Sequence, residues 1–453
     1  MANTYLSRNQ TGNTYTRTWT LSWWFKRSKL GTTQRMWTSD DDASGNNDDF
    51  FQWQSDDTIV FGFYASGYYA KMHTNRKFRD TNAWYHCVFA WDSTQTTASD
   101  RIKVYINGVQ ETSWLASDYP NQNSNSFIGG WSSNLYPIEC GRRGLDNTQH
   151  FDGSMSHCHF TDGTAYDASA FGETDATTGE WKIKTSVNVN YGTNGFFILK
   201  DGNSVTDQSG EGNNFTVGGG TLTKTEDSPS NVFATANPND VMKQSGGIYK
   251  PTFSNGNLTL SSSAGNNYQT FGTLAVDTGK YYWETKATDC DGHRVGVFFG
   301  NNKVHSGSYY FGANAFYIHQ NGQIYYNGSN TVYMSSLSDG DIVGVALDRT
   351  NGHIYLHKNG QYADGNGNND QTFANAVSIS TKLGVTMPSD ITYPFFDVYG
   401  TAIMDINFGN GYFGTTAVTT NSGNGYAGAE GKSIFNYQPP TGYSALSTLG
   451  LNE

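Results

Sequence analysis

Two oxygen-rich stretches of the sequence carry residue types that bind a hard cation such as calcium. Calcium takes about six to eight oxygen ligands, which carboxylates and carbonyl groups of loops supply. The candidate ligands fall in residues 40–49 and 201–213: Asp40, Asp41, Asp42, Asp48 and Asp49, and Asp201, Asn203, Asp207 and Asn213. A solvated acidic loop is the alternative reading of such runs. Calcium is therefore the one cofactor that the sequence suggests.

The tripeptide His157-Cys158-His159 contains ligands that zinc prefers, but its spacing argues against a zinc site. In a strand, the two imidazoles face one side and the thiol faces the other. The three groups cannot converge on one ion without help from elsewhere. We expect a hydrogen-bonded histidine pair here.

Enzymatic cleavage of a glycan needs two carboxyl groups placed on either side of one sugar bond. The nearest arrangement is Glu173-Thr-Asp175, followed by no further acid until Glu180 in a stretch that is typical of a loop. We therefore expect no enzyme, with a glycan hydrolase as the least favoured alternative.

Aromatic rings and amides remain as binding groups, because rings pack against the C–H faces of sugars and amides bind hydroxyls. The candidate ligand-binding residues are tyrosines in both halves of the chain: Tyr64, Tyr68, Tyr69, Tyr309, Tyr310, Tyr325 and Tyr326. The alternative is that these rings pack on sheet faces or between subunits.

The elements that must position these residues are strands. Trp19, Leu21, Trp23 and Phe25 alternate with polar residues, which predicts a strand with one buried face. The pair Asn107-Gly108 and three similar pairs, at 321–322, 327–328 and 359–360, favour tight hairpins. Helical periodicity is absent apart from short turns near residues 167–171. We predict an all-β protein.

Composition limits the partners. The 28 Lys+Arg against 40 Asp+Glu give a net charge of −12, which repels nucleic acid and anionic membrane surfaces. Residues 1–10 are polar, and no apolar run of about eighteen residues occurs, so we expect no membrane insertion. The four cysteines lack C-x-x-C spacing, which favours free thiols.

The first half resembles the laminin-G and pentraxin type of concanavalin-like sandwich. The segments that carry the resemblance are Trp19-Thr-Leu-Ser-Trp-Trp-Phe, Ala83-Trp-Tyr-His-Cys-Val-Phe-Ala-Trp, Arg101-Ile-Lys-Val-Tyr-Ile-Asn-Gly and Phe151-Asp-Gly-Ser-Met-Ser. The stretch 207–216 is similar to an element often found beside such domains.

The second half resembles a SPRY domain. The matching segments are Gly279-Lys-Tyr-Tyr-Trp-Glu-Thr, His293-Arg-Val-Gly-Val, Gly340-Asp-Ile-Val-Gly-Val-Ala-Leu-Asp, His353-Ile-Tyr-Leu-His-Lys-Asn-Gly and Tyr393-Pro-Phe-Phe. We therefore predict two antiparallel β-sandwiches in tandem, jelly-roll/concanavalin-like over 1–220 and SPRY-like over 245–415. An ordered connector over 221–244 and a C-terminal extension over 416–453 complete the chain, and residues 435–453 are either a docking strap or a frayed tail.

The combination of both modules is similar to structural proteins of marine bacteriophages. That resemblance implies a virion protein, assembled in the host cytoplasm, that acts as a tail fibre or an adhesin for a host-surface glycan. The alternative is a capsid decoration protein that binds other virion proteins. We expect a homo-oligomer, with a trimer as the first guess, although no heptad repeat supports it.

Overall fold

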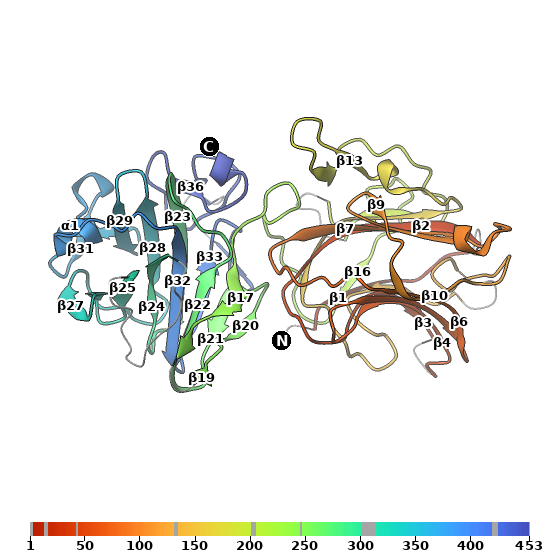
Figure 1. Cartoon of the computed structure of the whole chain (residues 1–453), viewed down its shortest axis with the longest axis horizontal. Helices are drawn as coiled ribbons and strands as arrows, with labels where there is room; N and C mark the ends of the chain where they lie inside the picture. The colour runs from red at the N-terminus through yellow and green to blue at the C-terminus, as the bar shows by residue number, and fades with distance from the viewer. Residues whose placement is uncertain are drawn as a thin grey trace. The chain divides into compact units, whose positions relative to one another are not determined.

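The computed structural model describes residues 3–12, 17–41, 44–130, 135–200, 205–244, 247–300, 314–418 and 425–452. The chain divides into two compact units, Met1–Lys224 and Thr225–Glu453 (Figure 1). The regular structure of both units is almost entirely strand, in mostly antiparallel sheets, which confirms the all-β prediction.

Two stacked sheets form the first unit (Figure 1). The eight-stranded sheet has the order β10 (Trp114–Asp118), β6 (Tyr68–Thr74), β5 (Ile59–Ala65), β4 (Asn47–Trp53), β3 (Gln34–Asp40), β11 (Ile138–Cys140), β1 (Tyr5–Arg8) and β16 (Thr216–Gly218). The six-stranded sheet has the order β15 (Phe196–Ile198), β12 (Gly153–Asp162), β2 (Thr18–Arg27), β7 (Trp84–Asp92), β8 (Ile102–Ile106) and β9 (Val109–Gln110).

Aromatic rings fill the space between these sheets. Trp19 stacks on Phe89 with ring centroids 5.4 Å apart, and Trp23 stacks on Phe51 at 5.6 Å. Each fully buried ring of this size stabilises the fold by about 1.5–3 kcal/mol. The strand predicted around Trp19 is therefore confirmed as β2, with its apolar face in the core.

The second face of β2 is also buried, which its alternating sequence did not predict. Residues 163–195 form an outer layer over the six-stranded sheet, with the 3-10 turn η2 (Ala168–Ala170) and the hairpin of β13 (Gly172–Thr174) and β14 (Trp181–Ile183). In this layer Phe171, Trp181 and Tyr166 pack around Val88. A short 3-10 turn, η1 (Ala98–Asp100), precedes β8.

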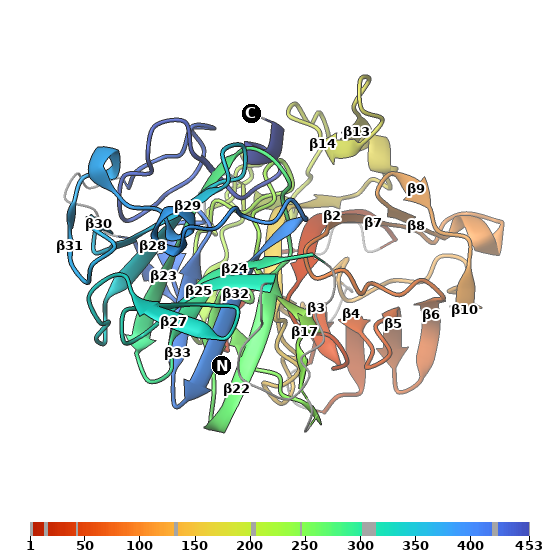
Figure 2. The same cartoon turned by 60° about the vertical axis from the view of Figure 1, so that its left-hand side comes forward.

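The second unit also contains two large sheets, seen from another side in Figure 2. The seven-stranded sheet has the order β17 (Ala236–Val241), β22 (Ala264–Gly272), β32 (Thr392–Gly400), β24 (Arg294–Phe299), β25 (Ala315–His319), β26 (Gln323–Tyr326) and β27 (Ser329–Val332). The nine-stranded sheet has the order β20 (Thr252–Ser254), β21 (Thr259–Ser261), β33 (Ile403–Asn407), β23 (Lys280–Asp289), β28 (Ile342–Asp348), β29 (His353–Lys358), β30 (Gln361–Ala363) and β31 (Asn369–Gln371), with β36 (Ser444–Ala445) parallel to β23.

Small elements complete the second unit. They are the two-stranded pairs β18 (Lys243–Gln244) with β19 (Gly247–Ile248) and β34 (Tyr412–Phe413) with β35 (Thr416–Ala417), the turns η4 (Phe373–Asn375) and η5 (Gly450–Asn452), and the helix α1 (Ile379–Leu383). The Ser378 side chain caps the N-terminus of α1, and Gly384 in the left-handed conformation ends it. The sequence analysis missed this helix because five residues are too few for periodicity.

The terminal parts of the second unit lie in its core. Phe435, Tyr443 and Leu446 are buried among the side chains of the main cluster, although residues 416–453 were expected as an extension. Likewise β17, within the expected connector, pairs with β22. These segments are structural parts of the second unit.

Three of the four predicted Asn-Gly turns have positive φ at both residues, whereas in the pair at 321–322 only Gly322 does. Asn107 and Gly108 both have positive φ, of 48° and 80°, and join β8 to β9. The pairs at 327–328 and 359–360 repeat this geometry between β26 and β27 and between β29 and β30. The four cysteines are buried free thiols, as predicted.

Candidate functional site

Two of the predicted tyrosines, the half-buried Tyr64 and the exposed Tyr68, form an aromatic pair on the outer face of the eight-stranded sheet. Tyr64 on β5 lies opposite Tyr68 on β6, with ring centroids 5.4 Å apart in an edge-to-face arrangement. The Tyr68 side chain is 52% exposed, which is the largest exposure of any aromatic ring among the exposed hydrophobic residues. The Nζ of Lys71 lies 5.1 Å from the centroid of the Tyr68 ring.

A buried charged pair supports these tyrosines from below. The Arg35 guanidinium donates to both oxygens of Asp48, at 2.7 and 2.8 Å, and lies 4.2 Å over the Phe50 ring. The Phe50 ring in turn meets Tyr68 edge to face at 6.4 Å. Bidentate pairing and stacking fix the Arg35 side chain, so the two rings rest on a rigid base.

Tyr69 does not belong to this aromatic pair. A register shift in the β5–β6 pairing turns its side chain inward, where its ring packs against Phe63 and Trp91. Its hydroxyl donates to Oδ1 of Asp49 at 2.6 Å. We therefore withdraw Tyr69 as a ligand-binding residue, because a β-bulge reverses the side that simple alternation assigns to it.

The described carboxylates of residues 40–49 accept hydrogen bonds from protein donors. Asp48 binds Arg35, and Oδ2 of Asp49 accepts from the backbone N–H groups of Phe127 and Ile128. Asp40 accepts from the backbone N–H groups of residues 144 and 145. Burial raises the pKa of Asp49 to about 8. Asp42 lies outside the described residues.

The described carboxylates of this stretch do not all point to the same side of the sheet. Asp40 and Asp48 face the outside of the sheet, whereas Asp49 faces the core. In the described part of the chain, no group of three or more His, Cys, Asp or Glu side chains is placed to hold a metal ion. We therefore do not carry Asp40, Asp48 and Asp49 forward as metal ligands.

In the second predicted calcium stretch, Asp207 organises a turn. Its carboxylate accepts from the backbone N–H groups of Phe197, Ser209 and Asn213, at 2.8–2.9 Å. Asp201 lies outside the described residues, as does Asn203. The turn at Asp207 leads into β16, which pairs with β1 and joins the two ends of the first unit.

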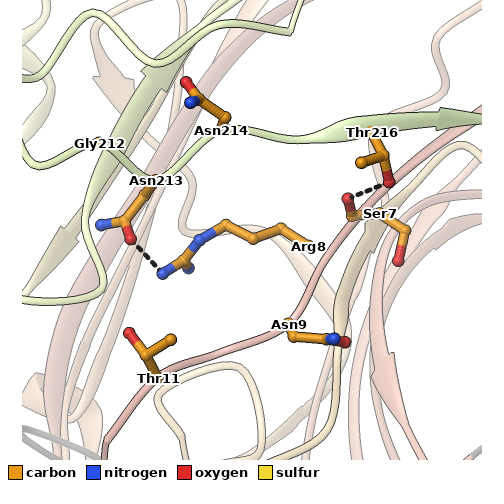
Figure 3. A pocket seen from close by; sticks show the side chains of 8 residues that line it. All are labelled: Ser7, Arg8, Asn9, Thr11, Gly212, Asn213, Asn214 and Thr216. Atoms are coloured by element: carbon orange, nitrogen blue, oxygen red, sulfur yellow. Dashed lines mark hydrogen bonds between the residues drawn. The ribbon is translucent and has the colours of Figure 1, made fainter.

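A polar cavity lies beside this turn (Figure 3). Its volume is about 350 Å3. Its lining residues are all small or polar: Ser7, Arg8, Asn9, Thr11, Gly212, Asn213, Asn214 and Thr216. Figure 3 shows the Arg8 side chain reaching from β1 towards Asn213 across the cavity.

The Arg8 guanidinium is fixed by neutral acceptors. Nη1 donates to the backbone oxygen of Asn194 at 3.2 Å, and Nη2 donates to the side-chain oxygens of Asn194 and Asn213. Arg8 is only 6% exposed, and burial lowers its pKa. The sequence analysis missed this cavity, because residues 7–11 and 212–216 come together only through the β1–β16 pairing.

Two candidate tyrosines of the second unit, Tyr325 and Tyr326, point to opposite faces of one sheet. Tyr325 stacks on Tyr317 with ring centroids 5.4 Å apart, whereas Tyr326 packs edge to face on Phe316 in the core. Tyr326 is therefore a packing residue, and Tyr325 is partly buried against its neighbour. Tyr309 and Tyr310 lie outside the described residues.

The histidines at 157 and 159 are hydrogen-bonded on the side of the sheet opposite Cys158. His159 Nδ1 lies 2.8 Å from the Tyr191 hydroxyl, and His157 Nδ1 lies 2.7 Å from Ser156 Oγ. Cys158 points into the core. Burial lowers the pKa of His159 far below its ordinary value, so this ring is neutral and its role is structural.

Comparison with known proteins places the first unit in a fold family. The family model described as the Concanavalin A-like lectin/glucanases superfamily matches residues 1–167. No curated protein matches the sequence. No helix in the described ranges is long and apolar enough to cross a membrane.

Solved structures similar to the chain include two SPRY domains. The SPRY domain of human HERC1 shares 19% identity at a TM-score of 0.28, over 38% of this chain and 96% of that one. The TRIM65 PSpry domain shares 12% sequence identity at a TM-score of 0.29, and the match covers 38% of this chain and 88% of that one. Stonustoxin shares 18% sequence identity at a TM-score of 0.29, and the match covers 38% of this chain and 27% of the toxin. Residues 1–167 are thus similar to the concanavalin A-like lectins and glucanases.

Proposed function

We propose that the chain is an attachment protein that binds a glycan through the aromatic pair Tyr64 and Tyr68. The observation that carries this proposal is the exposed Tyr68 ring, paired with the half-buried Tyr64, on a sheet of a unit that is similar to concanavalin A-like lectins. Tyrosine rings offer an apolar face to the C–H groups of a sugar, together with a polar tip.

The polar groups around the pair are free to bind hydroxyls. Within the described residues, the hydroxyls of Tyr64 and Tyr68 and the Lys71 ammonium make no hydrogen bond, so each can bind a ligand. The base of Phe50, Arg35 and Asp48 is already ordered, and binding therefore costs little side-chain entropy. An aromatic site at the surface, as here, fits weak, reversible contacts.

We further propose that the chain acts on the particle of a bacteriophage, in keeping with the resemblance of its two modules to phage structural proteins. Several copies on one particle turn weak single contacts into strong attachment. Other virion proteins are then its permanent partners, and the host-surface glycan is its reversible one.

A glycan array with the full chain tests the binding site. We expect a set of glycans to bind the wild-type protein and to bind Tyr68→Ala at least about tenfold more weakly, because the main stacking surface is removed. Leu115→Ala is the matched control, since Leu115 is 57% exposed on β10 of the same sheet. Equal binding by wild type and Tyr68→Ala would overturn the site.

Cryo-electron microscopy of intact particles tests the location. Density at the free end of a tail appendage, with the Tyr64–Tyr68 face open to solvent, supports attachment. Density that lies flat across shell subunits and covers this face would replace the proposal with capsid decoration.

A further inference from the structure

The polar cavity of the first unit contains a buried cation that forms no ion pair with a described residue. Arg8 is 6% exposed, and its hydrogen bonds go to the neutral oxygens of Asn194 and Asn213. Asp207 and Asp162 act on it only through longer-range electrostatic attraction. Over the ranges that the structure describes, no carboxylate lies within ion-pair distance of the guanidinium.

Part of the hydrogen-bonding capacity of Arg8 is unused. A guanidinium has five N–H donors, and the contacts to Asn194 and Asn213 use three of them. The Nε–H and the second Nη1–H donate to no described residue. These two donors lie on different edges of the planar guanidinium, because the edge that carries the Nε–H is shared with Nη2, so each is open to a single oxygen of an anion.

A buried, unpaired charge is costly, so an anion in the cavity would recover free energy that the empty protein lacks. Arg8 is the only charged residue among those that line the cavity. The other groups are amides and hydroxyls. Of these, the exposed Asn9 side chain makes no hydrogen bond to a described residue. Its amide is therefore available to a ligand.

We propose that this cavity binds an acidic saccharide, with the sugar carboxylate on Arg8 and the sugar hydroxyls on the amides of Asn9 and Asn214. The volume of about 350 Å3 is at the small end of ligand pockets and fits one sugar ring. The inference rests on the proposed glycan-binding function and gives it a second, charge-selective subsite. That subsite is separate in sequence and chemistry from the Tyr64–Tyr68 pair.

Titration of the full chain with galacturonic acid, galactose, galacturonic acid methyl ester and inorganic phosphate tests the subsite by calorimetry or NMR. We expect galacturonate to bind at least about tenfold more tightly than galactose or the ester, because only galacturonate forms the charge-assisted bonds. Equal binding of galacturonate and its ester overturns the proposal. Binding of phosphate without binding of galacturonate also overturns it, in favour of a phosphate site.

Two variants test whether the binding occurs in this cavity. Arg8→Gln keeps a polar side chain without the charge and should abolish the preference for the acid, but Arg8 also holds Asn194 and Asn213 and its loss can impair folding. Asn9→Asp avoids this difficulty, because it changes only an exposed amide to a carboxylate that repels the ligand. Asn121→Asp adds the same charge at another exposed position of the first unit and is the matched control.

The outcomes also separate this subsite from the tyrosine site. We expect Asn9→Asp to weaken galacturonate binding at least about tenfold. The variants Asn121→Asp and Tyr68→Ala should bind galacturonate as tightly as the wild type. If Tyr68→Ala removes glycan-array binding while Asn9→Asp binds galacturonate normally, the subsite is wrong and the proposed function stands. If galacturonate binding depends on Asn9 but the array shows no role for Tyr68, the subsite stands and the tyrosine site is wrong.

Discussion

The hydroxyl of Tyr69 on β6 donates a 2.6 Å hydrogen bond to Oδ1 of Asp49 on β4. The bond reaches across β5, which lies between these two strands in the sheet. Oδ2 of the same carboxylate accepts the backbone N–H groups of Phe127 and Ile128. One buried carboxylate therefore ties a strand, a tyrosine and a distant loop together. This geometry makes Tyr69 and Asp49 stabilising residues of the first unit.

Tyr69→Phe should destabilise the first unit by about 1–2 kcal/mol, because it removes one donor from a buried carboxylate. For a unit of this size the melting temperature should fall by roughly 2–8 °C. Differential scanning calorimetry measures this change. Tyr68→Phe is the control and should leave the melting temperature unchanged, since the Tyr68 ring is half exposed. Equal melting of the two variants would contradict the role assigned to Tyr69.

The contrast between Tyr68 and Tyr69 shows what the sequence could reveal about the site. Aromatic residues in a short hairpin were recognisable, and Tyr64 and Tyr68 do lie at the surface. The inward turn of Tyr69 results from a bulge, which moves one residue out of the alternation and leaves no signal in composition. The Arg8 cavity was hidden for a related reason, since its two walls are about 200 residues apart in the chain.

Gly62 on β5 controls the base of the tyrosine pair. A Cβ at this position would lie 2.3 Å from Cζ of Phe50, so the Phe50 ring would have to move away from β5. We expect Gly62→Ala to cost about 1–3 kcal/mol of stability and to weaken glycan binding, because Phe50 supports Tyr68 and Arg35. Urea unfolding and the glycan array measure the two effects.

Gly67→Ala is the matched control in the same hairpin. A Cβ at Gly67 meets nothing within 4 Å, and the backbone there has no positive φ. Stability should change by less than about 0.5 kcal/mol, with binding retained. Glycan binding that survives Gly62→Ala unchanged would mean that the position of Phe50 does not matter to the site.

Phe435 anchors the C-terminal segment to the second unit. Its ring is fully buried and meets Tyr282 edge to face at 4.8 Å. Phe435→Ala should cost about 3–5 kcal/mol, as for other large core deletions. Leu451→Ala, at a residue 38% exposed, should cost less than about 0.5 kcal/mol. Calorimetry of the full chain compares them, and a small effect of Phe435→Ala would show that the segment contributes little to the core.

The role of this segment was not predictable from the sequence. The sequence from Phe435 onwards shows no alternation of apolar and polar residues, and the strand β36, with two residues, is too short to show a pattern. Its burial depends on acceptors and apolar groups supplied by β23, which lies about 150 residues earlier. In contrast, the long alternating strands of the second unit were recognisable from their own residues, because each carries its buried face in its local sequence.

The Glu284 carboxylate on β23 holds this segment in place. It accepts hydrogen bonds from the backbone N–H groups of Asn436 and Tyr437, from the Asn407 amide and from the Tyr282 hydroxyl. Tyr282 also lies 2.6 Å from Nε2 of His357. The N–H of Gly360 points to Nδ1 of His357, so the proton of the neutral imidazole is on Nε2 and faces Tyr282.

This buried network predicts a dependence of stability on pH. Burial raises the pKa of Glu284 from 4.5 to about 7, against the effect of its four donors. Between these pH values the folded protein keeps a proton that the unfolded chain has lost, so the Glu284 contribution to stability falls as the pH rises. We expect this contribution to be on the order of 2 kcal/mol.

Glu284→Gln should flatten the plot of unfolding free energy against pH between about 4.5 and 7, measured by urea unfolding of the second unit. Its overall stability should be lower, because one amide oxygen cannot accept from all four donors. The slope is therefore the informative quantity. Asp370→Asn, at an exposed carboxylate, should keep the wild-type slope. If Glu284→Gln also keeps it, Glu284 is ionised throughout this range, and its four donors outweigh the cost of burying the charge.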